Sequence, residues 1–475
     1  MSADARLNLP AAEPQLETLY ESESKVYPRA VTGWFAGWRW TMVWITQLVF
    51  YSLPWLQWNG RPLMLFDLDA RRFHVFGLVL YPQDFIYLTA LLVIAALSLF
   101  FFTAVAGRLW CGYACPQTVY TEIFMWVERR IEGDRQARMR LDAAPWSARK
   151  VARKAAKHAA WIAIGGYTGF TFVGYFTPIR ALAHEIAALA VSPWETFWML
   201  FYGAATYGNA GWMREQVCKY MCPYARFQSA MIDDDSLIIT YDAGRGDPRG
   251  SRKRNADPRA LGLGDCIDCT LCVQVCPTGI DIRNGLQNEC IGCAACVDVC
   301  DKVMDKMGSP RGLIRYATQN GVAKRWTRAQ MLRRVLRPRV LVYFALLATL
   351  GIGFVASIAW RSPFRVDVIK ERNMLARTDD DGRIENVYRL QVLNATSDAQ
   401  QFRVEVSGMP GLEVVPRPPI AVAPEAIETA IVHVTLPPEA AQPWRGRSVP
   451  IRFRVRSAAG GVVDERSTFL VPREE

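Results

Sequence analysis

The chain has 475 residues, of which 51% are hydrophobic, 21% charged and 12% aromatic, and its formal net charge is +11. This composition excludes a disordered or fibrous protein, and the length allows two or three domains of roughly 150 residues each. A strongly basic chain is typical of proteins that bind nucleic acid or a membrane surface, and the placement of the basic residues decides between the two.

Five apolar runs are long enough to cross a membrane, since about 20 helical residues span a hydrocarbon core of roughly 30 Å. The second and fifth are the most apolar, whereas the first contains Pro54 and the fourth contains Glu195. Buried helices of a soluble domain are the alternative for these runs. Residues 1–30 are polar and lack a signal-peptide pattern, so we expect an uncleaved cytoplasmic tail at 1–36. The runs cover residues 37–56, 83–106, 155–177, 191–212 and 340–360.

The basic residues lie mainly in two loops. Residues 107–154 contain ten Lys or Arg, and residues 324–339 contain seven with no acidic residue, whereas residues 58–82 contain three. Because loops rich in Lys and Arg stay in the cytoplasm, the pattern predicts a multi-pass membrane protein with a cytoplasmic N-terminus and a C-terminal segment outside, in the periplasm if there is an outer membrane. The membrane topology thus explains most of the positive net charge. The sequence shows neither a nucleic-acid recognition motif nor the pattern of a basic groove studded with aromatic residues, so we expect no nucleic-acid partner.

Eight of the twelve cysteines fall in two runs, each with two, two and three residues between successive cysteines. In bacterial ferredoxins, three thiolates of such a run ligate one [4Fe–4S] cluster and the fourth ligates the other cluster. Zinc binding and disulfide bonds are the alternatives for these cysteines. Zinc sites use four ligands in paired spacing and do not require three closely spaced cysteines in a run, and disulfides are disfavoured in a cytoplasmic segment. Asp301 stands where a proline usually follows the last cysteine, and it places a negative charge beside the first cluster. The spacing predicts one cluster on Cys266, Cys269, Cys272 and Cys300, and a second on Cys276, Cys290, Cys293 and Cys296.

The other four cysteines form two copies of Cys-x-x-x-Cys-Pro, one at Cys111 and Cys115 and one at Cys218 and Cys222. Each copy follows a predicted span that ends on the cytoplasmic side, so we expect the four thiols at one depth. Bound copper or a further iron–sulfur centre is one interpretation, because thiolates are soft ligands. A dithiol–disulfide redox pair is the second interpretation, and helix ends kept for packing are the third. Among the histidines, the predicted topology allows His158 to approach this site, whereas His74 and His184 fall on the opposite side.

The segments outside the cysteine motifs indicate how the chain is divided into domains. Residues 241–264 are rich in Gly, Pro and charge, which predicts a linker between a four-span domain at 37–240 and a ferredoxin module at 265–310. A basic amphipathic segment at 311–339 leads into the fifth span, and residues 121–132 are typical of a helix along the inner membrane interface. Seven runs with a period of two predict an immunoglobulin-like β-sandwich at 361–475, for which we expect a docking role. These runs are 366–369, 387–392, 402–406, 412–415, 427–435, 449–455 and 469–471.

With these motifs, the chain resembles the CcoG/FixG/RdxA family of cytochrome c oxidase accessory proteins. The resemblance rests on Leu-Trp-Cys-Gly-Tyr-Ala-Cys-Pro-Gln-Thr at 109–118, on the second Cys-x-x-x-Cys-Pro copy continuing as Tyr-Ala-Arg at 224–226, and on the two cysteine runs. The order of the spans and the sandwich also matches, so the resemblance covers nearly the whole chain. It implies a protein of the bacterial inner membrane that helps to assemble a cbb-type cytochrome oxidase and reduces Cu(II) to Cu(I) for the copper site of that oxidase. Oxidase assembly factors or copper chaperones and transporters would be its partners.

In this interpretation, copper is held near Cys111, Cys115, Cys218 and Cys222, and an unidentified cytoplasmic donor supplies electrons through the two clusters. Two other functions stay open. The chain is also similar to membrane quinol dehydrogenases of the nitrate-reduction type, which implies quinol oxidation by the duplicated spans. A non-catalytic assembly scaffold would use its clusters only for folding or redox sensing.

Overall fold

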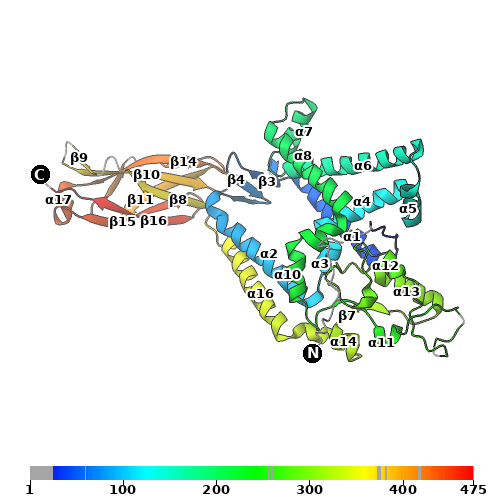
Figure 1. The fold of residues 1–475 in the computed structure, drawn as a ribbon. Coiled ribbons are helices and arrows are strands. Elements are labelled where there is room, and N and C mark those ends of the chain that lie inside the picture. The colour runs from blue at the N-terminus through cyan, green and yellow to red at the C-terminus, as the bar shows by residue number, and fades with distance from the viewer. Residues whose placement is uncertain are drawn as a thin grey trace, which may run out of the picture.

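The computed structural model describes residues 25–58, 60–254, 256–258, 260–371, 376–379, 382–396, 398–415 and 419–473. A group of helices occupies the middle of the molecule, a cysteine-rich module lies at one end, and a β-sandwich extends at the other (Figure 1). The part of the predicted N-terminal tail before residue 25 lies outside the described residues.

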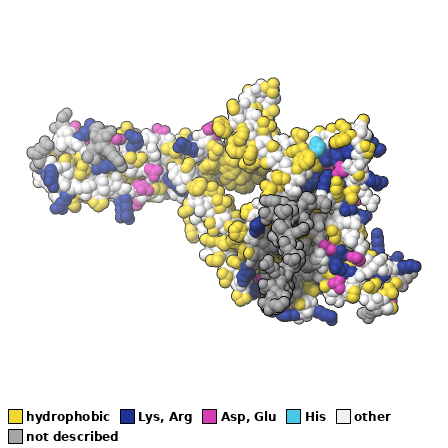
Figure 2. Space-filling view, viewed as in Figure 1, with side chains coloured by type: hydrophobic (Ala, Val, Ile, Leu, Met, Phe, Trp, Pro, Cys, Tyr) yellow, Lys and Arg dark blue, Asp and Glu magenta, His cyan; other side chains and the backbone are white. Residues whose placement is uncertain are grey.

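Each predicted span coincides with a helix. Two helical stretches, Pro82–Ala106 and Pro338–Ala359, are long and apolar enough to cross a membrane by length and composition. They pack side by side (Figure 1), and their outer surface is largely hydrophobic (Figure 2). The other three spans stay predictions, since α6 begins in a basic sequence and α8 has 15 residues. The five helices are α1 (Trp34–Ser52), α2 (Phe85–Ala106), α6 (Ala148–Val173), α8 (Pro193–Tyr207) and α16 (Pro338–Ala359).

Helices α6 and α8 pack with their backbones in close contact. A Cβ atom at Gly169 would lie 2.1 Å from the carbonyl oxygen of Met199, and one at Gly165 would lie 2.8 Å from that of Gly203. Glycine is needed at these positions because any side chain would push the helices apart. The contact fixes the direction of the chain after α8, which leads to Cys218.

Short helices connect these long ones. Proline is the first residue of α4 and α10, where its fixed φ favours the helix and its missing N–H is not needed. Both Cys-Pro dipeptides therefore place a cysteine at a helix N-cap, Cys115 before α4 and Cys222 before α10. The predicted interfacial helix at 121–132 is the C-terminal part of α4, which packs against α6. The short helices are α3 (Leu109–Tyr113), α4 (Pro116–Glu132), α5 (Arg135–Ala143), α7 (Ile179–Ala187), α9 (Arg214–Gln216) and α10 (Pro223–Met231).

A small antiparallel sheet between α1 and α2 is not predicted by the sequence. Its strands are β3 (Met64–Asp67), β4 (Arg72–Val75) and β5 (Leu78–Leu80), preceded by the two-residue pair β1 (Gln57–Trp58) and β2 (Arg61–Pro62). Strands of four residues or fewer are too short to show a clear alternation of polar and apolar residues.

The cysteine-rich module is larger than the sequence predicts. Strand β6 (Ile238–Tyr241) pairs with β7 (Ile314–Ala317), so the module closes outside the predicted limits of 265–310. The predicted linker at 241–264 packs onto it, since Arg245 Nε lies 2.5 Å from Asp265 Oδ2 and Arg252 donates to the Gly264 carbonyl at 2.7 Å. Its helices are α11 (Ala243–Gly246), α12 (Leu271–Gln274) and α13 (Ala295–Met307), followed by α14 (Gln319–Ala323) and α15 (Arg328–Arg333) in the predicted basic segment.

The C-terminal domain consists of two antiparallel sheets with a shared core. One sheet has the order β12-β14-β10-β8, with β9 paired to β10, and the other has the order β13-β11-β15-β16. All seven predicted runs fall on strands, because alternate residues point into the core, as in β15. The last strand is longer than predicted, and β9 and β13 are additional. The strands are β8 (Phe364–Lys370), β9 (Arg377–Thr378), β10 (Ile384–Asn394), β11 (Gln400–Ser407), β12 (Glu413–Val415), β13 (Ile420–Val422), β14 (Ile427–Leu436), β15 (Ser448–Ser457) and β16 (Val462–Leu470).

The sandwich docks on the small sheet between α1 and α2. Val79 and Tyr81 pack against Leu393 of the sandwich. The buried carboxylate of Asp84 pairs with Arg361, at 2.5 Å, and with Arg365. A buried carboxylate held by two guanidinium groups gives a defined joint between α2 and the sandwich.

Candidate functional site

Two cavities in the cysteine-rich module are lined by the eight cysteines of the two runs. The first is lined by Cys266, Cys269, Cys272 and Cys300. The second is lined by Cys276, Cys290, Cys293 and Cys296, and also by Cys272. Each cavity thus joins three cysteines of one run with the last cysteine of the other run, which is the arrangement that crossed ligation requires.

The cysteine loops turn around these cavities through left-handed residues. Asp268 and Thr270 flank Cys269 with φ of 54° and 55°, and Ala294 follows Cys293 with φ of 57°. When right- and left-handed residues alternate, successive backbone N–H groups point to the same side of the loop. The concave surface that these N–H groups form favours an anionic group. An iron–sulfur cluster with four thiolates is such a group.

Burial raises the pKa of the thiols in the two cavities. The pKa of Cys290 and of Cys300 rises to about 12 and that of Cys272 to about 11, chiefly because the surroundings exclude water. A thiolate at these positions therefore requires a positive partner such as iron. Within the described residues, no three His, Cys, Asp or Glu side chains are placed to hold a single metal ion. The cavities and their donor set fit [4Fe–4S] groups, and the assignment of ligands stays a prediction.

The four remaining cysteines, called here the four-thiol site, come together from two parts of the chain. Burial raises the pKa of Cys111 to about 12, and nearby Cys115, Cys218 and Cys222 add to this rise. Burial likewise raises the pKa of Cys218 to about 11, again with Cys115 and Cys222 close by. The thiol of Cys111 also donates to Gln228 Oε1 at 3.1 Å. The four thiols therefore lie in one region of the fold, with Cys111 and Cys218 in the same apolar cluster, and their role as a metal or redox site stays a prediction.

The four-thiol site lies directly against the loop of the second cavity. A Cβ atom at Gly112 would lie 2.9 Å from both N and Cα of Cys293, and Cys111 and Cys218 pack in one apolar cluster with Cys293. Tyr316 closes the contact by donating its hydroxyl to the Gly292 carbonyl at 2.5 Å. Cys111 and Cys293 are 182 residues apart in the sequence, so their proximity is set only by the fold.

Two buried arginines hold the contact together. Arg39 of α1 donates to the Cys293 carbonyl at 2.7 Å, and Arg108 donates to the carbonyls of Asn288 and Ala225. Asp298 of α13 in turn accepts from the N–H of Ala36 at 2.8 Å, at the N-terminus of α1. Helix α1 is thereby tied to the module at both its first turn and Arg39.

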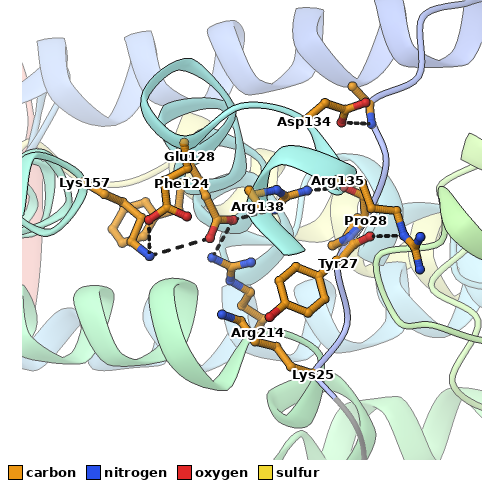
Figure 3. A network of polar contacts seen from close by, with 12 residues as sticks. Lys25, Tyr27, Pro28, Phe124, Glu128, Asp134, Arg135, Arg138, Lys157 and Arg214 are labelled. Carbon is orange, nitrogen blue, oxygen red and sulfur yellow. Dashed lines mark hydrogen bonds and ion pairs between the residues drawn. The ribbon is translucent and has the colours of Figure 1, made fainter. Parts of the chain in front are cut away.

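Figure 3 shows a buried ionic network around Glu128. Two members of this network, Arg138 and Arg214, line the same cavity as Cys218. Glu128 of α4 contacts Arg138 at 2.7 Å, Arg214 at 3.1 Å and Lys157 at 3.8 Å. Glu132, one turn later, contacts Lys157 at 3.0 Å. Burial alone would raise the pKa of Glu128, but Arg214, Arg138 and Lys157 outweigh it and lower that pKa below its ordinary value of 4.5.

This ionic network was not predicted from the sequence, although the spacing of residues on α4 contains a signal for it. Glu128 and Glu132 follow the buried Phe124 at intervals of four, so all three lie on the packed face of α4. Arg214 has a φ of 31° and separates two π-helices, Gly208–Met213 and Val217–Met221. π-helices and a strained residue next to Cys218 are typical of functional sites.

His158 does not extend the four-thiol site. It lies on α6, with Nδ1 at 3.0 Å from the hydroxyl of Tyr207 and its ring stacked on Trp212. The ring of His158 is therefore part of an aromatic layer that packs between α6 and the segment after α8.

Comparison with known families agrees with this architecture. A 4Fe–4S dicluster domain matches residues 213–319, and a 4Fe–4S binding domain matches residues 88–133, which include Cys111 and Cys115. A domain described as the IG-like fold at the C-terminus of FixG matches residues 354–472. The fold and the cysteine arrangement define an iron–sulfur electron-transfer protein with an immunoglobulin-like C-terminal domain.

Three relatives match over most of the chain. The nitrogen fixation protein FixG of Rhizobium meliloti is 40% identical over 88% of this chain and 88% of its own length. Protein RdxA of Cereibacter sphaeroides is 39% identical over 94% of this chain and 96% of its own, and protein RdxB of the same organism is 41% identical over 83% and 84%. The chain belongs to the FixG/RdxA family.

Proposed function

We propose that this protein is anchored in the bacterial inner membrane and reduces Cu(II) to Cu(I), its substrate, for the copper site of a cbb-type cytochrome oxidase. The observation that carries the proposal is the contact of the four-thiol site with the Cys293 loop, because it joins a set of soft ligands to an iron–sulfur module. Reduction of one Cu(II) ion takes one electron.

The chemistry of the four-thiol site favours the reduced ion. Thiolates prefer Cu(I) to harder ions, so binding at Cys111, Cys115, Cys218 or Cys222 draws copper towards its reduced state. Because burial raises the pKa of Cys111 and Cys218, metal binding must displace their protons. The iron–sulfur clusters, when bound, supply one-electron transfer. The buried network at Glu128 holds the backbone around Cys218 in place through Arg214.

The membrane arrangement and the partners are part of the same proposal. Helices α2 and α16 cross the membrane, together with the three weaker spans, and the C-terminal sandwich lies in the periplasm. Support comes from the apolar surface of α2 and α16 and from the basic residues near their ends at Arg108 and Arg337. Copper chaperones or transporters and oxidase assembly factors are the proposed partners, and the sandwich is the proposed docking module.

The test uses the full chain, purified without oxygen in detergent and chemically reduced. Mixed with Cu(II) and a Cu(I)-specific chelator, it forms Cu(I) in proportion to its reduced clusters. The double variant Cys111→Ser and Cys218→Ser loses this activity while keeping the iron of the ferredoxin module. Met221→Leu, which changes an exposed neighbour of Cys222, serves as the matched control and keeps full activity.

Two results would contradict the proposal. Intact, reducible clusters without Cu(I) formation exclude a cupric reductase. A Cys290→Ser variant whose loss of oxidase is not restored by excess Cu(I) in the medium favours an assembly scaffold instead.

A further inference from the structure

A large groove lies between α1, α4 and α6, outside the cysteine sites. Its volume is about 850 Å³, and most of its wall is aromatic or aliphatic, with Trp44, Leu48 and Ile123 among the lining side chains. All three elements border the region that the sequence places in the membrane. A groove of this size and composition holds a molecule with a long apolar tail.

The groove also has polar groups at fixed positions. Gln47 lines it, and the Oε1 atom of Gln47 is buried without a hydrogen-bond partner. Tyr51 lines it as well, with its hydroxyl 2.9 Å from Thr168 Oγ1 and 3.4 Å from the hydroxyl of Tyr120. A buried acceptor without a donor is unfavourable, so the site favours a ligand that brings a hydroxyl group. An acyl chain of a phospholipid has no such group.

The groove is separated from the cysteines by a single layer of side chains. Trp126 and Arg129 line this groove and also a second, smaller cavity of about 70 Å³, whose wall includes Cys218 and Cys293. Helix α1 also connects the groove with the Cys293 loop. Trp40 lines the groove, and the neighbouring residue Arg39 donates a hydrogen bond to the Cys293 carbonyl. A ring bound near Trp126 therefore lies beside the wall of the cavity that Cys218 and Cys293 line.

We propose that this groove binds a membrane quinol, which is the electron donor of the protein. The proposal rests on the proposed iron–sulfur function and names its reductant. One quinol loses two electrons and two protons and becomes a quinone. The two electrons reduce two Cu(II) ions to two Cu(I) ions, and [4Fe–4S] groups, when bound in the cysteine-rich module, would supply one-electron transfer. The two protons are released to the surrounding water.

The test combines labelling with a stoichiometric assay on the purified holoprotein in detergent. An azido-substituted ubiquinone analogue, after illumination, labels peptides of α1, α4 or α6, and decylubiquinol competes with the label. Decylubiquinol with Cu(II) and a Cu(I) chelator forms two Cu(I) per quinol oxidised, faster than the same mixture without protein.

Matched variants locate the site. Gln47→Leu weakens quinone labelling about three- to tenfold, the effect of one lost hydrogen bond. Leu48→Trp fills the groove and abolishes labelling, whereas Val49→Trp, at an exposed neighbour outside the groove wall, leaves it unchanged. All three variants keep their iron and still form Cu(I) after chemical reduction, which separates this proposal from the proposed function. Labelling that is equal in Leu48→Trp and Val49→Trp, or a tightly bound phospholipid that decylubiquinol does not displace, overturns the quinol site.

Discussion

The buried carboxylate of Glu128 is the centre of the ionic network beside the four-thiol site, and its neutralisation gives a quantitative test. The side chain is 3% exposed and faces Arg138, Arg214 and Lys157. In Glu128→Gln, Arg138 and Arg214 lose the carboxylate that they contact, whereas Lys157 keeps Glu132 as a buried counter-charge. Breaking a buried ion pair by removing one partner costs about 3–5 kcal/mol. Glutamine keeps the shape of the side chain and one hydrogen-bond acceptor, so we expect the free energy of unfolding to fall by about 3 kcal/mol, the lower end of this range.

This loss is measurable as a shift in thermal unfolding. For a cooperative unit of 150–250 residues, each kcal/mol lowers the midpoint by about 2–4 °C, so Glu128→Gln unfolds about 6–12 °C below the wild type. Tryptophan fluorescence of the detergent-purified protein, recorded during heating, measures the midpoint. Glu122→Gln is the matched control on the same helix, since Glu122 is only partly buried, and we expect a shift of less than 2 °C.

The same pair of proteins gives a pH test with a defined sign. The pKa of Glu128 is lower in the folded chain than in the unfolded chain, so its stabilisation is full above the unfolded value near 4.5 and is lost as pH falls through the folded value. The difference in midpoint between wild type and Glu128→Gln is therefore constant from pH 8 to pH 6 and narrows in acid below about pH 4.5. Equal midpoints at neutral pH would refute the assigned role of the network.

Three further changes test the contacts around the site. Gly112→Ala places a methyl group 2.9 Å from the Cys293 backbone, which cannot swing aside, so it costs about 1–3 kcal/mol and slows Cu(I) formation at unchanged iron content. Asp298→Ala removes the acceptor at the start of α1, costs about 1–2 kcal/mol and speeds proteolysis of the N-terminal segment. Asp84→Asn leaves Arg361 without its buried counter-charge, and trypsin releases the C-terminal domain faster.

Each of these variants has a control within the chain. Gly166→Ala adds a methyl group on α6 where no atom lies within 4 Å, so it leaves Cu(I) formation unchanged. Asp464→Asn removes an exposed partner of Arg454 and does not alter domain release. If Gly112→Ala behaves like Gly166→Ala, the close approach to Cys293 has no part in electron transfer.

Much of the fold could be predicted because its signals are local. The alternation in 449–455 and 427–435 places β15 and β14 correctly, since one face of each strand is buried in the sandwich. The apolar run at 83–106 coincides with α2 for a similar reason. The sheet at β3–β5 and the docking of Asp84 escaped prediction, because short strands and isolated ion pairs leave no periodic pattern.

The sequence by itself determined the chemistry of the cysteine module. Two runs with fixed intervals specify which thiols can reach a common cavity, because a few residues of chain between ligands permit few geometries. Only the tertiary structure decided what lies next to that module. Cys111 meets Cys293, Glu128 meets Arg214, and Trp126 separates the membrane groove from Cys218, each through contacts between elements far apart in the chain. Such contacts arise from the packing of many side chains at once, and no local pattern encodes them.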